Sequence, residues 1–256
     1  MVRVNNKISV IIPTYNREGL VIRAVQSVLN QSYRNIEVIV VDDHSTDNTE
    51  ERIKEIKDKR LKYIKLSKNN GACYARNVGI FESSGEYVAF QDSDDVFHVD
   101  KLERQFTNLI NSNSDLDFCK IGIHAQENIY YIPSEKQDKI INEINLLDEL
   151  CKGNFISTQS ILVRREVLEH IFFDPLLPRL QDYDLVLRIV PKYKVSYTRE
   201  SLVDLYRQDD NISNSYEKLE QACYIMIEKN YCLSELQKDL LIKTLIGYIS
   251  KSEFDK

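Results

Sequence analysis

The sequence predicts an α/β protein with a mostly parallel central sheet and flanking helices, a mixed second half and a helical C-terminal extension. From residue 8 to about residue 110, short β-rich runs alternate with longer amphipathic runs, as in repeated βα units. The run from Ile36 to Val41 is almost wholly apolar, which is typical of a strand covered on both faces. With 256 residues, 43% of them hydrophobic, the chain can bury a substantial core.

Four strands are expected in the first half, with helices between and after them. The predicted strands are Ile8 to Ile12, Ile36 to Val41, Leu61 to Leu66 and Glu86 to Phe90. Apolar stripes predict helices from Leu20 to Leu29, around Ile53 and Ile56 after a start at Ser45-Thr46, and from Leu102 to Ile110, and a further helix follows Asn70-Gly71.

The pattern changes after about residue 114, where strand-like runs alternate with a helix expected near Asn142 to Cys151 and another that begins at Gln181. We therefore divide the chain into residues 1–113, a second half of the same domain at 114–214, and a helical extension at 215–256. The two helical stripes of the extension are expected to pack on the domain, while pairing with a second copy, as a homodimer, stays open.

Composition excludes several classes of protein. The net charge of -6 argues against a general electrostatic grip on nucleic acid. The 7 glycines form no phosphate-cradling motif, and the 5 cysteines are scattered as expected for free buried thiols in a reducing cytosol. Because no signal peptide or membrane span is recognisable, we expect a cytoplasmic protein, with contact at the inner face of the cell membrane left open.

Polar residues follow each of the four strands, at the edge where ligands bind in parallel sheets. The most informative loop is Asp92-Ser93-Asp94-Asp95, because three neighbouring carboxylates repel one another unless a cation compensates them. Such oxygen ligands suit Mg²⁺ or Mn²⁺, which bring substrate phosphates. The alternative is that these aspartates cap the helix after Phe97.

The other loops allow two interpretations each. Asp42 and Asp43 are suited to hydrogen bonds with a base or ribose, whereas the following Ser45 to Asp47 are more simply a helix cap. Tyr15 could stack on a base or belong to the core, and Arg76 could contact a phosphate or be an ordinary solvated arginine.

Six segments in order resemble the family 2 inverting glycosyltransferases, which have the Rossmann-like GT-A fold. They are S-V-I-I-P-T-Y-N-R (9–17), S-V-L-N-Q-S-Y (27–33), V-V-D-D-H-S-T-D (40–47), N-N-G-A-C-Y-A-R-N (69–77), Q-D-S-D-D (91–95) and L-Q-D-Y-D-L-V-L-R (180–188). The last forty residues match no motif of that family. The resemblance implies a nucleotide-sugar donor, most often UDP-linked, bound by the first half, and a saccharide or lipid-linked saccharide acceptor bound by the second, in polysaccharide biosynthesis.

The resemblance also implies roles for individual residues. The donor would be held by residues of the first four loops and by Gln181, namely Thr14, Tyr15, Asn16, Asp42, Asp43, Asn70, Gly71, Arg76 and Asp92. Asp92 and Asp94 fall on the family's D-x-D motif, with Asp94, Asp92 and Asp95 as candidate ligands of Mn²⁺ or Mg²⁺. Asp182 falls on the position of the general base.

Two positions depart from the family's pattern. Gln181 stands where many members have an acidic residue, and Asp209 stands about where a histidine metal ligand is often found. Two other functions stay open: a haloacid-dehalogenase-like phosphatase that uses Asp92 as nucleophile, and a non-catalytic nucleotide-sugar-binding module.

Overall fold

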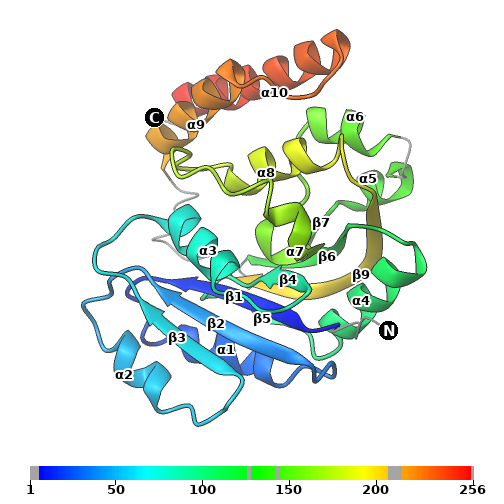
Figure 1. The fold of residues 1–256 in the computed structure, drawn as a ribbon. Helices are drawn as coiled ribbons and strands as arrows, with labels where there is room; N and C mark the ends of the chain where they lie inside the picture. Colours follow the sequence, from blue (N-terminus) through cyan, green and yellow to red (C-terminus); the bar gives the residue numbers. More distant parts are fainter. Residues whose placement is uncertain (1–5, 126–127, 142–144, 207–214, 255–256) are drawn as a thin grey trace.

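A computed structural model of the chain describes residues 6–125, 128–141, 145–206 and 215–254. Within these ranges one sheet runs through the molecule (Figure 1), and its strands lie in the order β3-β2-β1-β4-β8-β6-β9-β5, with β7 paired to β6. The strands are β1 (Ile8–Thr14), β2 (Ile36–Asp42), β3 (Leu61–Lys65), β4 (Tyr87–Phe90), β5 (Val96–Phe97), β6 (Leu116–Ala125), β7 (Asn128–Ile132), β8 (Ile161–Arg164) and β9 (Val195–Tyr206).

The first four strands are parallel, and the later ones are mixed. Strand β1 pairs in parallel with β2 and β4, and β2 pairs in parallel with β3. Strand β8 then runs antiparallel to β4 and β6, whereas β6 and β9 are parallel, with a register shift between Cys119 and Ile121. The predicted α/β class and the mixed second half are thus confirmed.

Helices cover both faces of this sheet. They are α1 (Val21–Leu29), α2 (Thr49–Lys54), α3 (Ala72–Phe81), α4 (Lys101–Asn111), α5 (Glu135–Ile140), α6 (Leu146–Cys151), α7 (Arg165–Leu168), α8 (Gln181–Ile189), α9 (Tyr216–Glu228) and α10 (Glu235–Phe254). Helices α3, α7 and α8 lie on one side, α1, α2 and α4 on the other, and α9 and α10 stack beyond α8 (Figure 1).

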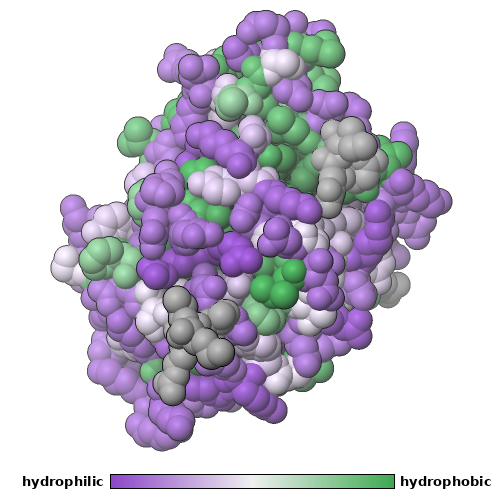
Figure 2. Space-filling model, turned by 45° about the vertical axis from the view of Figure 1, so that its right-hand side comes forward, coloured by the Kyte–Doolittle hydropathy of each residue, from purple (hydrophilic) through white to green (hydrophobic). Residues whose placement is uncertain are grey.

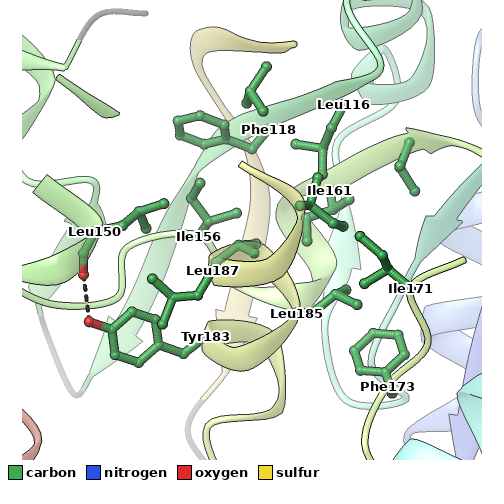
Figure 3. Packing of buried hydrophobic residues seen from close by; sticks show 14 of the residues in the cluster. Leu116, Phe118, Leu150, Ile156, Ile161, Ile171, Phe173, Tyr183, Leu185 and Leu187 are labelled. Carbon is green, nitrogen blue, oxygen red and sulfur yellow. Dashed lines mark hydrogen bonds between the residues drawn. The ribbon is translucent and has the colours of Figure 1, made fainter. Parts of the chain in front are cut away.

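Two hydrophobic clusters follow from the alternation of side chains along β1. Val10 and Ile12 point to the cluster under α1 and α4, whereas Ile11 points to the other cluster, under α3 and α8. Figure 3 shows part of this second cluster, in which the Tyr183 hydroxyl donates a hydrogen bond of 2.5 Å to the carbonyl oxygen of Leu150. A buried tyrosine needs such a partner for its hydroxyl, and this one links α8 to α6.

Several boundaries differ from the predictions. Helix α2 begins at Thr49 rather than at Ser45-Thr46, and the Ser45 hydroxyl instead accepts a hydrogen bond from the Asn16 N–H at 2.9 Å. Helix α4 begins at Lys101, with Asp100 at its N-cap and strand β5 before it. The carboxylates of residues 92–95 therefore do not cap this helix, and that alternative is wrong.

The C-terminal helices pack on the domain, as expected from their stripes. Cys223 and Met226 of α9 and Leu245 of α10 are fully buried in the cluster under α8. Pairing with a second copy stays a prediction: Leu236 and Ile246 are exposed, and hydrophobic residues gather near the top of the face drawn in Figure 2. Within the described ranges, no helix combines the length and the apolar character needed to span a membrane.

A buried ionic cluster joins α8 to this extension. The Asp184 carboxylate is fully buried, and one of its oxygens accepts hydrogen bonds from Lys229 Nζ at 2.7 Å and from the Tyr231 hydroxyl at 2.8 Å. Its other oxygen accepts from the guanidinium of Arg188 at 2.5 and 3.0 Å. Both oxygens are thus satisfied, as a buried charge requires.

Candidate active site

A cavity of about 1150 Å³ opens where the carboxyl ends of the first strands meet the start of α8. Such a volume is somewhat above the roughly 300–1,000 Å³ usual for ligand pockets. It is lined by residues from both halves and from α9, among them Thr14, Tyr15, Asn16, Asp43, Gly71, Arg76, Asp92, Asp94, Asp95, Gln181 and Asp182. The structure therefore brings together most of the site residues that were predicted from loops scattered along the chain.

Asp42 is not among the lining residues. Its carboxylate is fully buried and accepts hydrogen bonds from the Ser45 N–H at 2.7 Å and from the Tyr63 hydroxyl at 2.5 Å. Both oxygens face protein donors and Asp42 lies behind the cavity wall, so substrate binding by this residue stays a prediction. Burial together with the Asp42 carboxylate raises the pKa of Tyr63, so this hydroxyl stays a donor.

Asp43, unlike Asp42, lines the cavity. Its two oxygens accept hydrogen bonds from the N–H groups of Asn70 at 2.8 Å and Gly71 at 2.7 Å. Gly71 has a φ of 88°, which favours glycine, and it stands at the N-cap of α3. The carboxylate of the second loop thus fixes the backbone of the third.

Asn70 is placed differently from the prediction. It does not line the cavity, and its side-chain amide donates to the Lys68 carbonyl at 2.8 Å, whereas its neighbours Asn69 and Gly71 do line it. Asn16 lines the cavity and also has a local role, since its side-chain oxygen accepts a hydrogen bond from the Thr46 N–H at 2.9 Å. The first and second loops are therefore fastened to each other beside the cavity.

Arg76 is a bridge between the two halves of the site. Its buried guanidinium donates to the Asp92 carboxylate at 2.7 Å and to the side-chain oxygen of Gln181 at 2.8 Å. The same cation therefore contacts both the loop of residues 92–95 after β4, here called the acidic loop, and Gln181, the first residue of α8. Gln181 lies 105 positions after Arg76 in the chain. Gln181 departs from the family's pattern, in which many members have an acidic residue here. Its neutral side chain accepts a hydrogen bond from Arg76, whereas an acidic side chain would form an ion pair with that arginine.

The three aspartates of the acidic loop have different surroundings. Asp95 is buried, and its two oxygens accept from the Gln159 side-chain amide at 2.7 Å and from the Tyr206 N–H at 3.2 Å. Burial, together with the neighbouring carboxylates Asp92 and Asp94, raises the pKa of Asp95. Asp94 is only partly buried, and its carbonyl oxygen accepts from Arg23 at 2.5 Å.

Metal ligands were predicted in this loop. Across the ranges that the structure describes, no three His, Cys, Asp or Glu side chains are already grouped as a metal site. Asp209, the remaining candidate ligand, lies outside the described residues. The acidic loop offers hard oxygen donors from Asp92 and Asp94, a set that fits a divalent cation which takes its other ligands from substrate phosphates and water.

Asp182 lies in the first turn of α8, on the cavity wall. The preceding Leu180 has a φ of 57°, which is rare for a leucine and is a backbone conformation often found at functional sites. One oxygen of Asp182 accepts from the Tyr183 N–H at 2.8 Å. Burial raises the pKa of Asp182, and this effect exceeds the opposing one of Arg76.

Several buried polar atoms around the cavity have no partner among the described residues. The Thr14 and Ser157 hydroxyls and the Nε of Arg76 are buried without a hydrogen bond, and all three residues line the cavity. Unpaired buried polar groups are costly, so such a group in a cavity wall points to a polar ligand. Neither Ser157 nor Gln159, Arg179 or Lys218 was singled out from the sequence, because none of them follows a strand of the first half.

Comparison with known proteins decides the family. A model of the family described as "Glycosyl transferase family 2" matches residues 9–172. The chain belongs to this family. The match covers the loops of the first half and strand β8, and it ends before α8 and the C-terminal helices.

Relatives that match over most of their length agree with this assignment. A glycosyltransferase of Haemophilus influenzae described as uncharacterized is 31% identical over 226 residues, which cover 85% of each chain. The putative teichuronic acid biosynthesis glycosyltransferase TuaG of Bacillus subtilis is 29% identical over 252 residues, which cover 93% of this chain and 97% of TuaG.

Solved structures show the same fold. Residues 1–349 of S. aureus TarS, in complex with UDP-GlcNAc, superpose with a TM-score of 0.77 at 23% identity, covering 97% of this chain and 74% of that one. The mannosyltransferase PcManGT of Pyrobaculum calidifontis, in complex with GDP-Man and Mn²⁺, gives a TM-score of 0.69 at 16% identity, covering 96% and 73%. The chain thus has the GT-A fold expected from its motifs.

Proposed function

We propose that this glycosyltransferase moves a sugar from a nucleotide-sugar donor, of the UDP type, to a hydroxyl group of a saccharide acceptor with inversion at the anomeric carbon. The observation that carries the proposal is the Arg76 bridge between Asp92 and Gln181. It holds the acidic loop beside the start of α8, so the donor-binding loops and Asp182 face one cavity. Family membership argues against the phosphatase alternative.

The donor lies, in this proposal, along the ends of the first strands. Thr14 supplies an unpaired buried hydroxyl and Tyr15 a half-exposed ring suited to stacking on a base. Asp43 supplies a carboxylate at the cavity wall, each of whose oxygens has a second lone pair besides the one that accepts from Asn70 or Gly71. These groups match the hydrogen-bonding and stacking needs of a nucleoside. TarS, which shares the fold, was solved with UDP-GlcNAc, and this supports the choice of a UDP-type donor.

Mn²⁺ or Mg²⁺ would be held by Asp94 and Asp92 on the donor's diphosphate. The two oxygens of Asp95 are already engaged by Gln159 and Tyr206, so we assign Asp95 to shaping the loop. Such a cation supplies charge neutralisation for the departing diphosphate. PcManGT, of the same fold, was solved with Mn²⁺.

Asp182 acts as the general base. The acceptor oxygen forms a bond to the anomeric carbon while the bond from that carbon to the diphosphate oxygen breaks, and the hydroxyl proton passes to the Asp182 carboxylate. Its raised pKa, caused by burial, makes it a better base than an exposed aspartate. Single displacement needs one such carboxylate, and Asp184 is committed to the ionic cluster under α8.

The acceptor is proposed to be a growing cell-envelope saccharide. TuaG, similar over nearly its whole length, is named for teichuronic acid biosynthesis, which supports a polysaccharide product. We keep a lipid-linked form of this acceptor, and a peripheral membrane contact at the cytoplasmic face, as parts of the proposal.

Two substitutions test the proposal. Asp182→Asn is expected to keep UDP binding and lower transfer by about 10²–10⁴-fold, the usual contribution of a general base. Asp94→Ala is expected to weaken metal-dependent UDP binding, as measured by titration calorimetry with and without Mn²⁺. Asp174→Asn, at a partly exposed position, serves as the control and should change neither UDP binding nor transfer.

The outcomes separate the competing functions. Transfer at the wild-type rate by Asp182→Asn would refute the assignment of the base. If the wild-type protein binds UDP-sugars but Asp182→Asn has an unchanged binding and turnover profile, the chain is a binding module. Release of phosphate from a phosphate ester, abolished by Asp92→Asn, would instead favour the phosphatase.

A further inference from the structure

Two cations in the cavity wall come from the part of the chain that the family model does not cover. Arg179 precedes α8, and Lys218 belongs to the first turns of α9, whereas the family match ends at residue 172. Both residues line the same cavity as Asp182. The C-terminal extension therefore takes part in the candidate site.

Ser215 contacts both of these residues. Its carbonyl oxygen accepts a hydrogen bond from the Arg179 guanidinium at 2.9 Å. Its hydroxyl accepts from the Lys218 N–H at 3.3 Å and so caps α9. A single residue thus fixes both the arginine side chain and the turn that carries the lysine.

Neither cation is paired with a carboxylate within the described part of the chain. The ion pairs found there do not include Arg179 or Lys218, although Arg76 in the same cavity pairs with Asp92 at 2.7 Å. Partial burial of Arg179 lowers its pKa, which reflects the cost of a cation whose hydrogen-bond partner is a neutral carbonyl. A ligand oxyanion would relieve that cost.

The surroundings place this cationic pair on the acceptor's side. The donor-binding groups Thr14, Tyr15 and Asp43 come from the first half, whereas Arg179, Lys218 and apolar residues of β6 and β7 line the same cavity from the rest of the chain. Ile121 pairs with Ile132 across the two strands, and both line the cavity. Cross-strand partners share a face of the sheet, so these two strands add apolar surface to the cavity that also contains the two cations.

We propose that Arg179 and Lys218 form an oxyanion subsite that binds a phosphate or carboxylate group of the acceptor near the hydroxyl that Asp182 deprotonates. The subsite would select an acidic acceptor over a neutral one. It rests on the proposed function, because it assigns this side of the cavity to the acceptor. The same oxyanion chemistry could serve the donor's diphosphate, and the experiment below distinguishes the two sources.

The test uses small probes on the full chain, because the acceptor is unidentified. Glycerol 3-phosphate and glycerate carry an oxyanion beside a hydroxyl group, and glycerol is the neutral match. Each probe is titrated by calorimetry, with and without saturating UDP and Mg²⁺. The variants are Lys218→Met and Arg179→Met, and Lys243→Met removes an equal charge from the exposed surface of α10 as the matched control.

The expected result is a preference of about fivefold or more for the anionic probes over glycerol, present with UDP bound. Lys218→Met should weaken this preference and Arg179→Met should remove it, while Lys243→Met keeps it and all three variants bind UDP as the wild type does. Circular dichroism of Arg179→Met checks that the loss is not a loss of the fold, and Lys218→Met, at an exposed position, gives the answer independently.

Three outcomes would overturn the proposal. Equal binding of charged and neutral probes by the wild type would show that no oxyanion subsite exists. A retained preference in both variants would place the subsite elsewhere. A preference that vanishes when UDP is bound, with weaker UDP binding in the variants, would assign the cations to the donor. Failure of the wild type to bind UDP at all would count against the proposed function, whereas the titration without UDP still reports on the subsite.

Discussion

Replacement of Asp184 by asparagine tests how the C-terminal helices are held against α8. The fully buried carboxylate accepts hydrogen bonds from Lys229, Tyr231 and Arg188, at distances from 2.5 to 3.0 Å. An asparagine keeps one acceptor oxygen, but its amide group must then face either Lys229 or Arg188, which are both donors. One set of charge-assisted hydrogen bonds is therefore lost, and two cations lose their buried countercharge.

The expected cost follows from these contacts. Removal of one partner from a buried ion pair typically costs about 3–5 kcal/mol. The lower end applies here, because Lys229 keeps its ion pair with Asp174 at 2.6 Å and Arg188 keeps the Phe172 carbonyl at 2.7 Å. A loss of about 3 kcal/mol corresponds to a fall in melting temperature of roughly 6–12 °C in a chain of this size.

Urea unfolding followed by far-ultraviolet circular dichroism measures this cost. Asp174→Asn is the matched control: it removes a partner of the same lysine from a partly exposed pair, and about 1 kcal/mol or less is expected from the lost ion pair. The double variant with Lys229→Met should reveal a coupling free energy of about 1–3 kcal/mol with Asp184. A loss below 1 kcal/mol for Asp184→Asn, or one equal to that of the control, would refute the reasoning.

Three further predictions concern the loops and the buried charge. Gly71→Ala should weaken UDP binding and cost about 1–3 kcal/mol in urea unfolding, because its φ of 88° strains any other residue. Arg76→Lys should lower transfer at least about tenfold with the fold retained by circular dichroism, since a lysine does not reproduce the fork that reaches both Asp92 and Gln181. Burial lowers the pKa of Lys101 to about 8, so the folded protein loses this proton before the unfolded chain does, and stability should rise with pH from about 8 towards 10. Urea unfolding of Lys101→Met over this range should lack that rise.

The first half of the fold could be predicted because each of its strands is recognisable from a local sequence pattern. The run from Ile36 to Val41 is apolar except at Glu37, and it forms β2 with one residue more. The sequence does not say which of Asp42 and Asp43 faces the cavity, because that depends on the register between strands. Val40 pairs with Tyr63, so Tyr63 lies diagonally across from Asp42. The Tyr63 hydroxyl therefore donates a hydrogen bond to the Asp42 carboxylate.

The site's long-range contacts could not be predicted from local pattern. Arg76 and Gln181 are 105 residues apart, and spacing alone left Arg76 equally plausible as a solvated side chain. The resemblance implied roles for Asp92 and Asp182, but only the fold shows that Arg76 contacts both Asp92 and Gln181, the residue before Asp182. The second half was less predictable, since β6 pairs with β7, β8 and β9 along different parts of its length.

The C-terminal extension is best understood as part of the site. The motifs of the family end at α8, and the sequence of the extension carries none, so only its apolar stripes could be interpreted. Yet Lys229 and Tyr231 satisfy a carboxylate two residues beyond the candidate base, and Ser215 anchors Arg179 three residues before it. Under the proposed oxyanion subsite, an acidic chain with a net charge of -6 needs cations where the acidic acceptor lies. The extension supplies one of these cations and contacts the other through Ser215, so the proposal assigns part of the acceptor selectivity to a segment outside the family's motifs.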